Sequence, residues 1–153
     1  MEREEEKPVK LEDAVSYALD EARMILPGIQ ALFGFQLVAV FNDRFPDVFG
    51  AFGQALHLAA LVLVALSCAL AMTPAAFHRQ TDPSKISGEL LELSSFFIGS
   101  AMIPLMAAIS IDVGLVGYVV TGSDAISTGL GAVCALVFAA LWLVFPRWRR
   151  RRR

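Results

Sequence analysis

The chain has 153 residues, of which 56% are hydrophobic and 18% are charged, and its mean hydropathy is +0.60. The charges gather at the ends, because residues 1–23 hold 12 of the 28 charged residues and residues 147–153 hold six. A soluble domain carries about 25% charged residues over its whole surface, and a disordered chain has a low apolar content. The composition therefore excludes both classes and favours a membrane-embedded middle between charged ends.

The first predicted element is an amphipathic helix over residues 8–23. Pro8 suits a first helical turn, and Leu11, Val15, Leu19 and Ala22 then repeat at helical spacing beside acidic residues. Membrane surfaces select Lys and Arg on the polar face of such a helix, not acids. We therefore expect residues 1–23 to be an acidic cytoplasmic extension that runs into the first span and docks on the protein's own second cytoplasmic loop or tail.

Four stretches free of Asp, Glu, Lys and Arg follow, and each is long enough to approach the roughly 20 residues of a spanning helix. None alternates with the period of two that marks a membrane β-barrel. The predicted fold class is all-α, a four-helix transmembrane bundle over residues 24–146, followed by a basic cytoplasmic tail at residues 147–153. We expect the spans at about residues 24–42, 55–76, 93–120 and 125–145, with the third helix starting near Ser87.

The far end of the third span has two alternatives. Asp112 interrupts the apolar run, which then continues from Val113 to Val120. If the helix continues to Val120, Asp112 lies well inside the membrane, where a carboxylate must be neutral or paired and suits a proton or cation site. If the span ends at Ile111, Asp112 merely caps it at the outer surface.

The basic residues predict the orientation. With four spans both termini lie on one side, which carries 12 of the 13 Lys and Arg residues, whereas the other side carries Arg44 alone. The positive-inside rule then places both termini in the cytoplasm. The arginine tail, with Trp142 and Trp148 at interface depth, is expected to bind anionic lipid headgroups and not nucleic acid.

Motifs of soluble enzymes are missing from the sequence, and the two cysteines lie 66 residues apart, so we expect no enzyme, metal site or cofactor. The candidate ion-pathway residues are the polar groups of the membrane region, with Asp112 first. His57 opens the second span and is either a pH-sensitive partner of Asp112 or an interfacial histidine that bonds the outer loop. Gln30 and Gln36 lie nearly opposite one another on the first span. Either one faces a pathway while the other bonds a neighbouring helix, or both bond neighbouring helices.

Charged and polar residues at the ends of the first span are either interface anchors or, if several copies surround an axis, groups that select or gate ions. These are Glu21, Arg23, Asn42 and Asp43. Small residues at four-residue spacing predict helix contacts within or between subunits. They are Ser95, Gly99, Gly131, Ala135 and Ala139. Because four helices leave little room for a private hydrated pathway, a transport role favours a homo-oligomer.

The segments EARMILPGIQALFGFQLVAVFN, LHLAALVLVALSCALAMTPAAFHR and SIDVGLVGYVV resemble an uncharacterised family of small bacterial four-span proteins. This resemblance covers residues 15–120 and implies a multi-pass protein of the bacterial inner membrane. Some members carry the label sodium:proton antiporter, which implies ion exchange, although this chain lacks the many spans and discontinuous helices of familiar antiporters.

Residues 34–42, GFQLVAVFN, are similar to the pore-lining first helix of the Orai calcium-channel family. His57 at the start of the second span and the basic end of the fourth fit the same pattern. The resemblance implies four spans, cytoplasmic termini and a pore of first helices around an axis, with Gly34, Val38 and Asn42 on the pore. Asn42 stands where that family has an acidic selectivity residue, with Asp43 beside it, so calcium selectivity is not implied.

These observations together predict a homo-oligomeric inner-membrane protein that conducts or exchanges small cations or protons. The alternative is a non-transporting membrane scaffold or envelope sensor, in which the acidic helix and the arginine tail dock a cytoplasmic partner.

Overall fold

The computed structural model describes residues 10–81 and 87–152. Over these residues the chain is all-α, without a strand, and consists of four long helical rods. The rods are α1 (Leu11–Val40), α3 (Ala51–Gln80), α4 (Gly88–Thr121), and a fourth that joins α5 (Asp124–Phe138), the π-helical segment η1 (Ala139–Val144) and α6 (Phe145–Arg151). Each rod is long and apolar enough to cross a membrane, which identifies a multi-pass membrane protein and confirms the predicted fold class.

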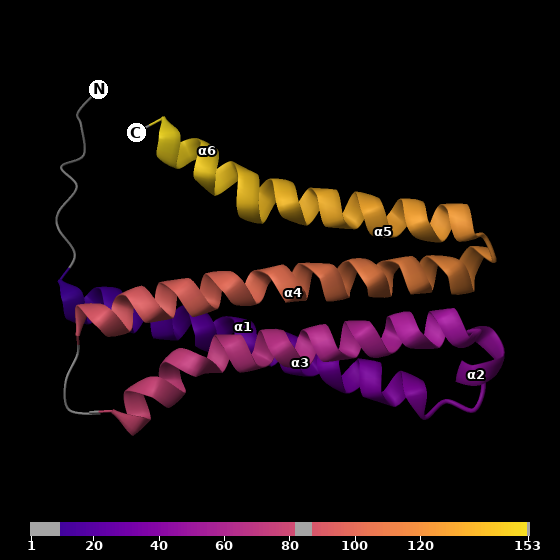
Figure 1. Cartoon of the computed structure of the whole chain (residues 1–153), viewed down its shortest axis with the longest axis horizontal. Helices are drawn as coiled ribbons and strands as arrows, with labels where there is room; N and C mark the ends of the chain where they lie inside the picture. The colour runs from indigo at the N-terminus through magenta and orange to yellow at the C-terminus, as the bar shows by residue number, and fades with distance from the viewer. Residues whose placement is uncertain (1–9, 82–86, 153) are drawn as a thin grey trace.

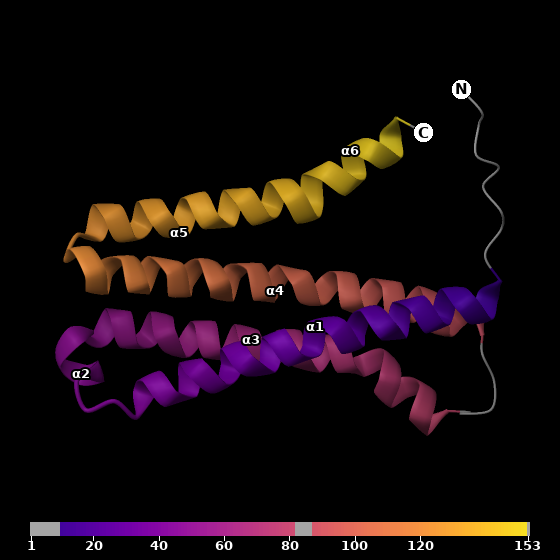
Figure 2. The same ribbon diagram turned by 180° about the vertical axis from the view of Figure 1, so that it is seen from behind.

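Successive rods run side by side in opposite directions along the long axis of the molecule (Figure 1). The start of α1 and the end of α6 therefore lie at one end of the molecule, which we call the terminal end. The short helix α2 (Phe45–Val48) and the turn between α4 and α5 lie at the opposite end, which we call the α2 end (Figure 2).

The helices extend beyond the predicted spans, except that α1 ends at Val40, two residues before the expected end at residue 42. α1 is a single helix of 30 residues that joins the predicted amphipathic segment to the first span, and α3 begins four residues before and ends four residues after residues 55–76. At about 1.5 Å per residue, a 30-residue helix is roughly 45 Å long and exceeds the hydrocarbon core of a bilayer. The predicted helix start at Pro8 lies outside the described residues, as do the middle of the polar turn before Ser87 and the last arginine of the tail.

The ends of α4 follow from local capping. The side chain of Ser87 accepts a hydrogen bond from the Leu90 amide at 3.2 Å, which caps the start where it was predicted. The helix ends at Gly122, whose φ of +65° suits glycine because it lacks a Cβ. Between these caps α4 continues through Asp112, so this residue does not cap the helix, as one of the two alternatives required.

The core lies between α1, α3 and α4, and its seams repeat every seven residues. In α1 the buried residues are Val15, Ala22, Ile29 and Gln36. In α3 they alternate in steps of three and four from His57 to Pro74, which is the pattern of coiled-coil packing. The wholly buried hydroxyl of Ser67 donates to the Ala101 carbonyl at 2.8 Å and joins α3 to α4.

The fourth rod is attached to α4 and contributes no buried residue to the core. Its contact is close near the α2 end, where the Ser127 hydroxyl donates to the Gly114 carbonyl at 2.7 Å. A Cβ atom added to Gly131 would lie 3.0 Å from the Ser110 carbonyl oxygen, so the two backbones almost touch. Glycine at these positions permits the approach, as in other membrane helix pairs.

Candidate functional site

Three helices each contribute one polar side chain to a cluster in the core. The Gln36 amide nitrogen, Nε2, donates to Oδ2 of Asp112 at 2.7 Å, and Nε2 of His57 donates to the backbone carbonyl of Gln36 at 2.9 Å. Because a carbonyl oxygen only accepts, the second bond requires a proton on Nε2 of His57. Gln36 and His57 are 4% and 7% exposed and are therefore buried, whereas Asp112 is half-buried.

The cluster lies inside the helices and not in the loops. His57 is six residues from the start of α3, and Asp112 is nine residues from the end of α4. These separations correspond to about 9 Å and 14 Å along a helix. The three side chains therefore lie within the long helices, nearer to the α2 end than to the terminal end.

One atom of the cluster has no partner. Oε1 of Gln36 is buried and accepts no hydrogen bond from any described residue. Leaving a buried acceptor unpaired costs about 1–3 kcal/mol, so such atoms are rare unless a ligand, a water molecule or a change of protonation state completes them. The amide thus has a free acceptor directly beside a carboxylate.

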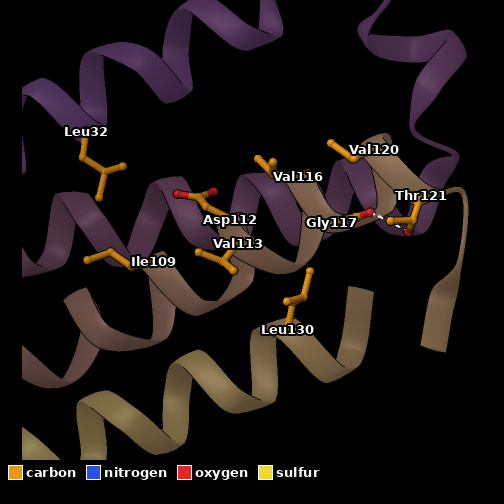
Figure 3. A pocket seen from close by; sticks show the side chains of 9 residues that line it. All are labelled: Leu32, Ile109, Asp112, Val113, Val116, Gly117, Val120, Thr121 and Leu130. Atoms are coloured by element: carbon orange, nitrogen blue, oxygen red, sulfur yellow. Dashed lines mark hydrogen bonds between the residues drawn. The ribbon is translucent and has the colours of Figure 1, made fainter. Parts of the chain in front are cut away.

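Asp112 also lines a groove of about 440 Å³ between α1 and the fourth rod. Figure 3 shows its carboxylate among aliphatic side chains, with Leu32 of α1 on one side and Leu130 of α5 on the other. At the far end of the groove the Thr121 hydroxyl donates to the Gly117 carbonyl at 2.8 Å. Asp112 is the only ionisable group among the lining residues, so the carboxylate reaches both the buried amide and an apolar opening.

His57 is held from two sides. Its second neighbour, besides the Gln36 carbonyl, is the ring of Phe45 in α2, which meets the imidazole edge-on with 5.1 Å between ring centroids. The predicted alternative of a hydrogen bond to the outer loop is therefore replaced by an aromatic contact with that loop. No direct hydrogen bond joins the described side chains of His57 and Asp112.

The other predicted pathway residues lie on α1 or in the turn that follows it, and they do not join this cluster. Glu21, Arg23, Gln30, Val38, Asn42 and Asp43 are exposed, and Gly34 is half-buried. Arg23 forms an ion pair with Asp20 at 3.0 Å, and the Asn42 side chain accepts from the Arg44 amide at 3.0 Å.

The predicted packing residues also divide into two groups. Gly131 lies at the α4–α5 contact, while Ala135 and Ala139 are half-buried along the same rod. Ser95 and Gly99 are exposed on α4, and a Cβ atom added at Gly99 would meet nothing within 4 Å. Ser95 and Gly99 thus remain free for a contact outside the chain.

The sequence reasoning left the role of Gln36 open and did not include Gly114 and Gly117 among the packing residues. Both glycines face α5 closely, because an added Cβ would lie 3.2 Å from the Ser127 carbonyl oxygen and 2.8 Å from the Leu130 side chain, respectively. Their three-residue spacing on an apolar helix is a signal that was available.

Comparison with known proteins places the chain in a family. Residues 4–146 match the family described as a family of unknown function, DUF6328. The chain belongs to this family. The matched region contains Gln36, His57 and Asp112 together with the three helices that carry them. No curated protein and no solved structure matches the chain. The resemblance to an uncharacterised family is thus confirmed, and the function is argued from the site.

Proposed function

We propose that this protein conducts or exchanges protons or small cations across a bacterial inner membrane, with Asp112 as the group that binds and releases the ion. The observation that supports the proposal is an ionisable carboxylate inside a spanning helix, hydrogen-bonded to a buried amide of a second helix. Ionisable side chains in spanning segments are costly and are typical of ion and proton paths. A purely structural polar contact would not need a carboxylate.

The Gln36 amide suits a carboxylate that changes its protonation state. When Asp112 is ionised, the Nε2 group donates to it, as observed. When Asp112 binds a proton, its hydroxyl needs an acceptor, and a half-turn of the amide presents the unpartnered Oε1 in place of Nε2. A small cation in place of the proton uses the same two oxygens as ligands. The Gln36 amide can therefore hydrogen-bond Asp112 when the carboxylate is ionised and when it holds a proton or a cation.

In the proposed function, His57 transfers protons to and from Asp112, and this role depends on the orientation of the chain in the membrane. With the basic terminal end in the cytoplasm, as the Lys and Arg distribution predicts, the α2 end faces the outside. His57 then stands between the outer loop and Asp112, and its Nδ1 atom bonds no described residue. An imidazole in this position transfers protons between the outer surface and the carboxylate.

Self-association completes the proposal. Gln30 is exposed in the spanning part of α1, where lipid offers its amide no partner. A second copy provides such a partner, since polar side chains hydrogen-bond across membrane helices. We therefore propose that the transporting unit is a homo-oligomer.

Flux in liposomes tests the proposed function. The purified protein is reconstituted, and proton and cation movement is followed with a trapped pH-sensitive dye under an imposed gradient. Asp112→Asn keeps the size of the side chain and a partner for Gln36 but removes the charge, so we expect flux to fall by about tenfold or more. Asp124→Asn makes the same chemical change at an exposed position of α5 and serves as the matched control.

The control is expected to retain the flux of the unchanged protein. If the unchanged protein conducts no more than Asp112→Asn at any pH and with any cation tested, the proposed function is wrong.

A further inference from the structure

The face of α4 that contacts α5 continues along the helix toward the terminal end, where no described residue covers it. Near the α2 end, Ser110, Gly114 and Gly117 lie on this face and contact α5. Toward the terminal end, the same face continues in helical steps of three and four residues. These residues, which we call the open face, are Glu89, Glu92, Phe96, Gly99 and Ile103.

The fourth rod leaves α4 before it reaches the open face. Figures 1 and 2 both show α6 well away from the start of α4, whereas α5 lies directly beside the end of α4. η1 and α6, which we call the C-terminal arm, make no extensive contact with α1, α3 or α4. The π-helical segment ends two residues before Pro146, which has no N–H to donate to the Trp142 carbonyl, so the regular helical bonding changes in this region.

The open face and the arm are complementary in charge. Glu89 and Glu92 are exposed at the start of α4, and α6 carries a run of exposed arginines at the same end of the molecule. Within residues 10–81 and 87–152, no arginine of α6 forms an ion pair with an acidic side chain. The apolar part of the face is also uncovered, since Phe96 is 66% exposed and Ile103 is 52% exposed.

We propose that the open face of α4 binds the C-terminal arm of a second copy of this chain. Two copies inserted in the membrane with the same orientation bring each arm antiparallel to the other copy's α4, at the level where the arginines meet Glu89 and Glu92. Gly99 allows the close approach that Gly114 and Gly131 allow within the chain. The exchange is reciprocal, so a two-fold interface closes on itself.

The occupant is a second copy because the chain's own arm is directed elsewhere. The close backbone contact between Ser110 and Gly131 fixes the direction in which the fourth rod leaves α4. The interface continues an observed contact along the same face, with the same antiparallel direction. This inference depends on self-association and not on ion movement, so it stands or falls separately from the flux experiment.

Charge reversal in two differently tagged full-length copies tests the proposal. Variant A carries Glu89→Arg and Glu92→Arg, and variant B carries Arg149→Glu, Arg150→Glu and Arg151→Glu. We expect co-purification of like copies, in nanodiscs of neutral lipid, to fall by about tenfold for A alone and for B alone, because attraction becomes repulsion at two or more charge pairs. In the mixture of A with B, both reciprocal contacts become attractive again, so co-purification is expected to return.

Two further variants complete the experiment. Glu12→Arg with Asp13→Arg reverses two exposed acids at the start of α1, at the same end of the molecule, and should leave co-purification unchanged. A chain that carries all the changes of A and B together should associate with itself, which shows that loss in A or B alone is not misfolding.

Three results would overturn the proposal. They are a monomeric unchanged protein, normal association of A, and absence of rescue in the A–B mixture. If the experiment is repeated in nanodiscs of anionic lipid, loss in B with normal A in that lipid alone would show that the arginines bind headgroups instead.

Discussion

The hydrogen bond between Gln36 and Asp112 can be tested by its coupling energy. Gln36→Leu keeps the approximate size of the side chain and removes both the donor to Asp112 and the unpartnered Oε1. Loss of a donor to a charged acceptor costs about 1.5–3 kcal/mol, whereas removal of a buried unpaired oxygen returns about 1–3 kcal/mol. The single variant is therefore expected to change the free energy of unfolding only slightly.

The informative quantity is the coupling energy, which is the difference between the effect of Gln36→Leu on the free energy of unfolding with Asp112 present and its effect with Asp112 replaced. In an Asp112→Leu background, Gln36 has neither an acceptor for Nε2 nor a donor for Oε1, so Gln36→Leu should stabilise the protein. Polar pairs in membrane helices couple by about 0.6 kcal/mol on average and by about 1.7 kcal/mol at most. A hydrogen bond of 2.7 Å from a neutral amide to a carboxylate should lie at the upper end, so we expect a coupling of about 1–2 kcal/mol.

The assay is equilibrium unfolding in mixed micelles, with increasing mole fraction of a denaturing detergent and helix content as the readout. Gln30→Leu makes the same substitution on the same helix at an exposed position. Its effect should be additive with Asp112→Leu within about 0.5 kcal/mol, because the two residues share no contact. If the Gln36 cycle is also additive within that range, the two side chains do not interact and the proposed ion site loses its support.

Three further predictions use the same unfolding assay or the flux assay. Gly131→Val should destabilise the protein by about 1–3 kcal/mol, because its Cβ would press on the Ser110 carbonyl, whereas Gly129→Ala, with open space around it, should not destabilise it. Ser67→Ala should cost about 0.6 kcal/mol through loss of the hydroxyl bond between α3 and α4. His57→Phe keeps the aromatic contact with Phe45 but removes the proton-carrying nitrogens, so flux should persist weakly and lose its dependence on external pH, whereas an unchanged pH profile would exclude a role for the imidazole.

The number of spans was predictable because charge is excluded from the bilayer core. Four runs without Asp, Glu, Lys or Arg correspond to the four rods, and the Ser87 cap fixed one helix start correctly. The lengths were not predictable from the same rule, since a helix need not end where its side chains become polar. α3 continues to Gln80, beyond the expected end near residue 76, because His78 and Arg79 suit the last turn of a helix.

Asp112 illustrates what composition cannot supply. The apolar residues 113–120 suggested that the helix continues, and it does, but the sequence could not name the partner of the carboxylate. Gln36 is 76 residues away, and its contact depends on how α1 is rotated against α4. In a soluble helix the polar face reports this rotation, whereas in a membrane both the lipid and the core are apolar, so the usual signal disappears.

The rotation of α1 can nevertheless be predicted from the amphipathic residues at the start of the helix. Val15 and Ala22 belong to the apolar face of the amphipathic segment, and both are buried. Because α1 is one continuous helix packed with a seven-residue repeat, the same face must continue in steps of seven. The next two steps are Ile29 and Gln36, so the amide that contacts Asp112 lies on the same helix face as the apolar residues of the amphipathic segment. Gln30 does not lie on this face of α1 and is exposed, whereas Gln36 lies on it and is buried. The two glutamines therefore differ in their position on the helix face, which the residue type alone does not reveal.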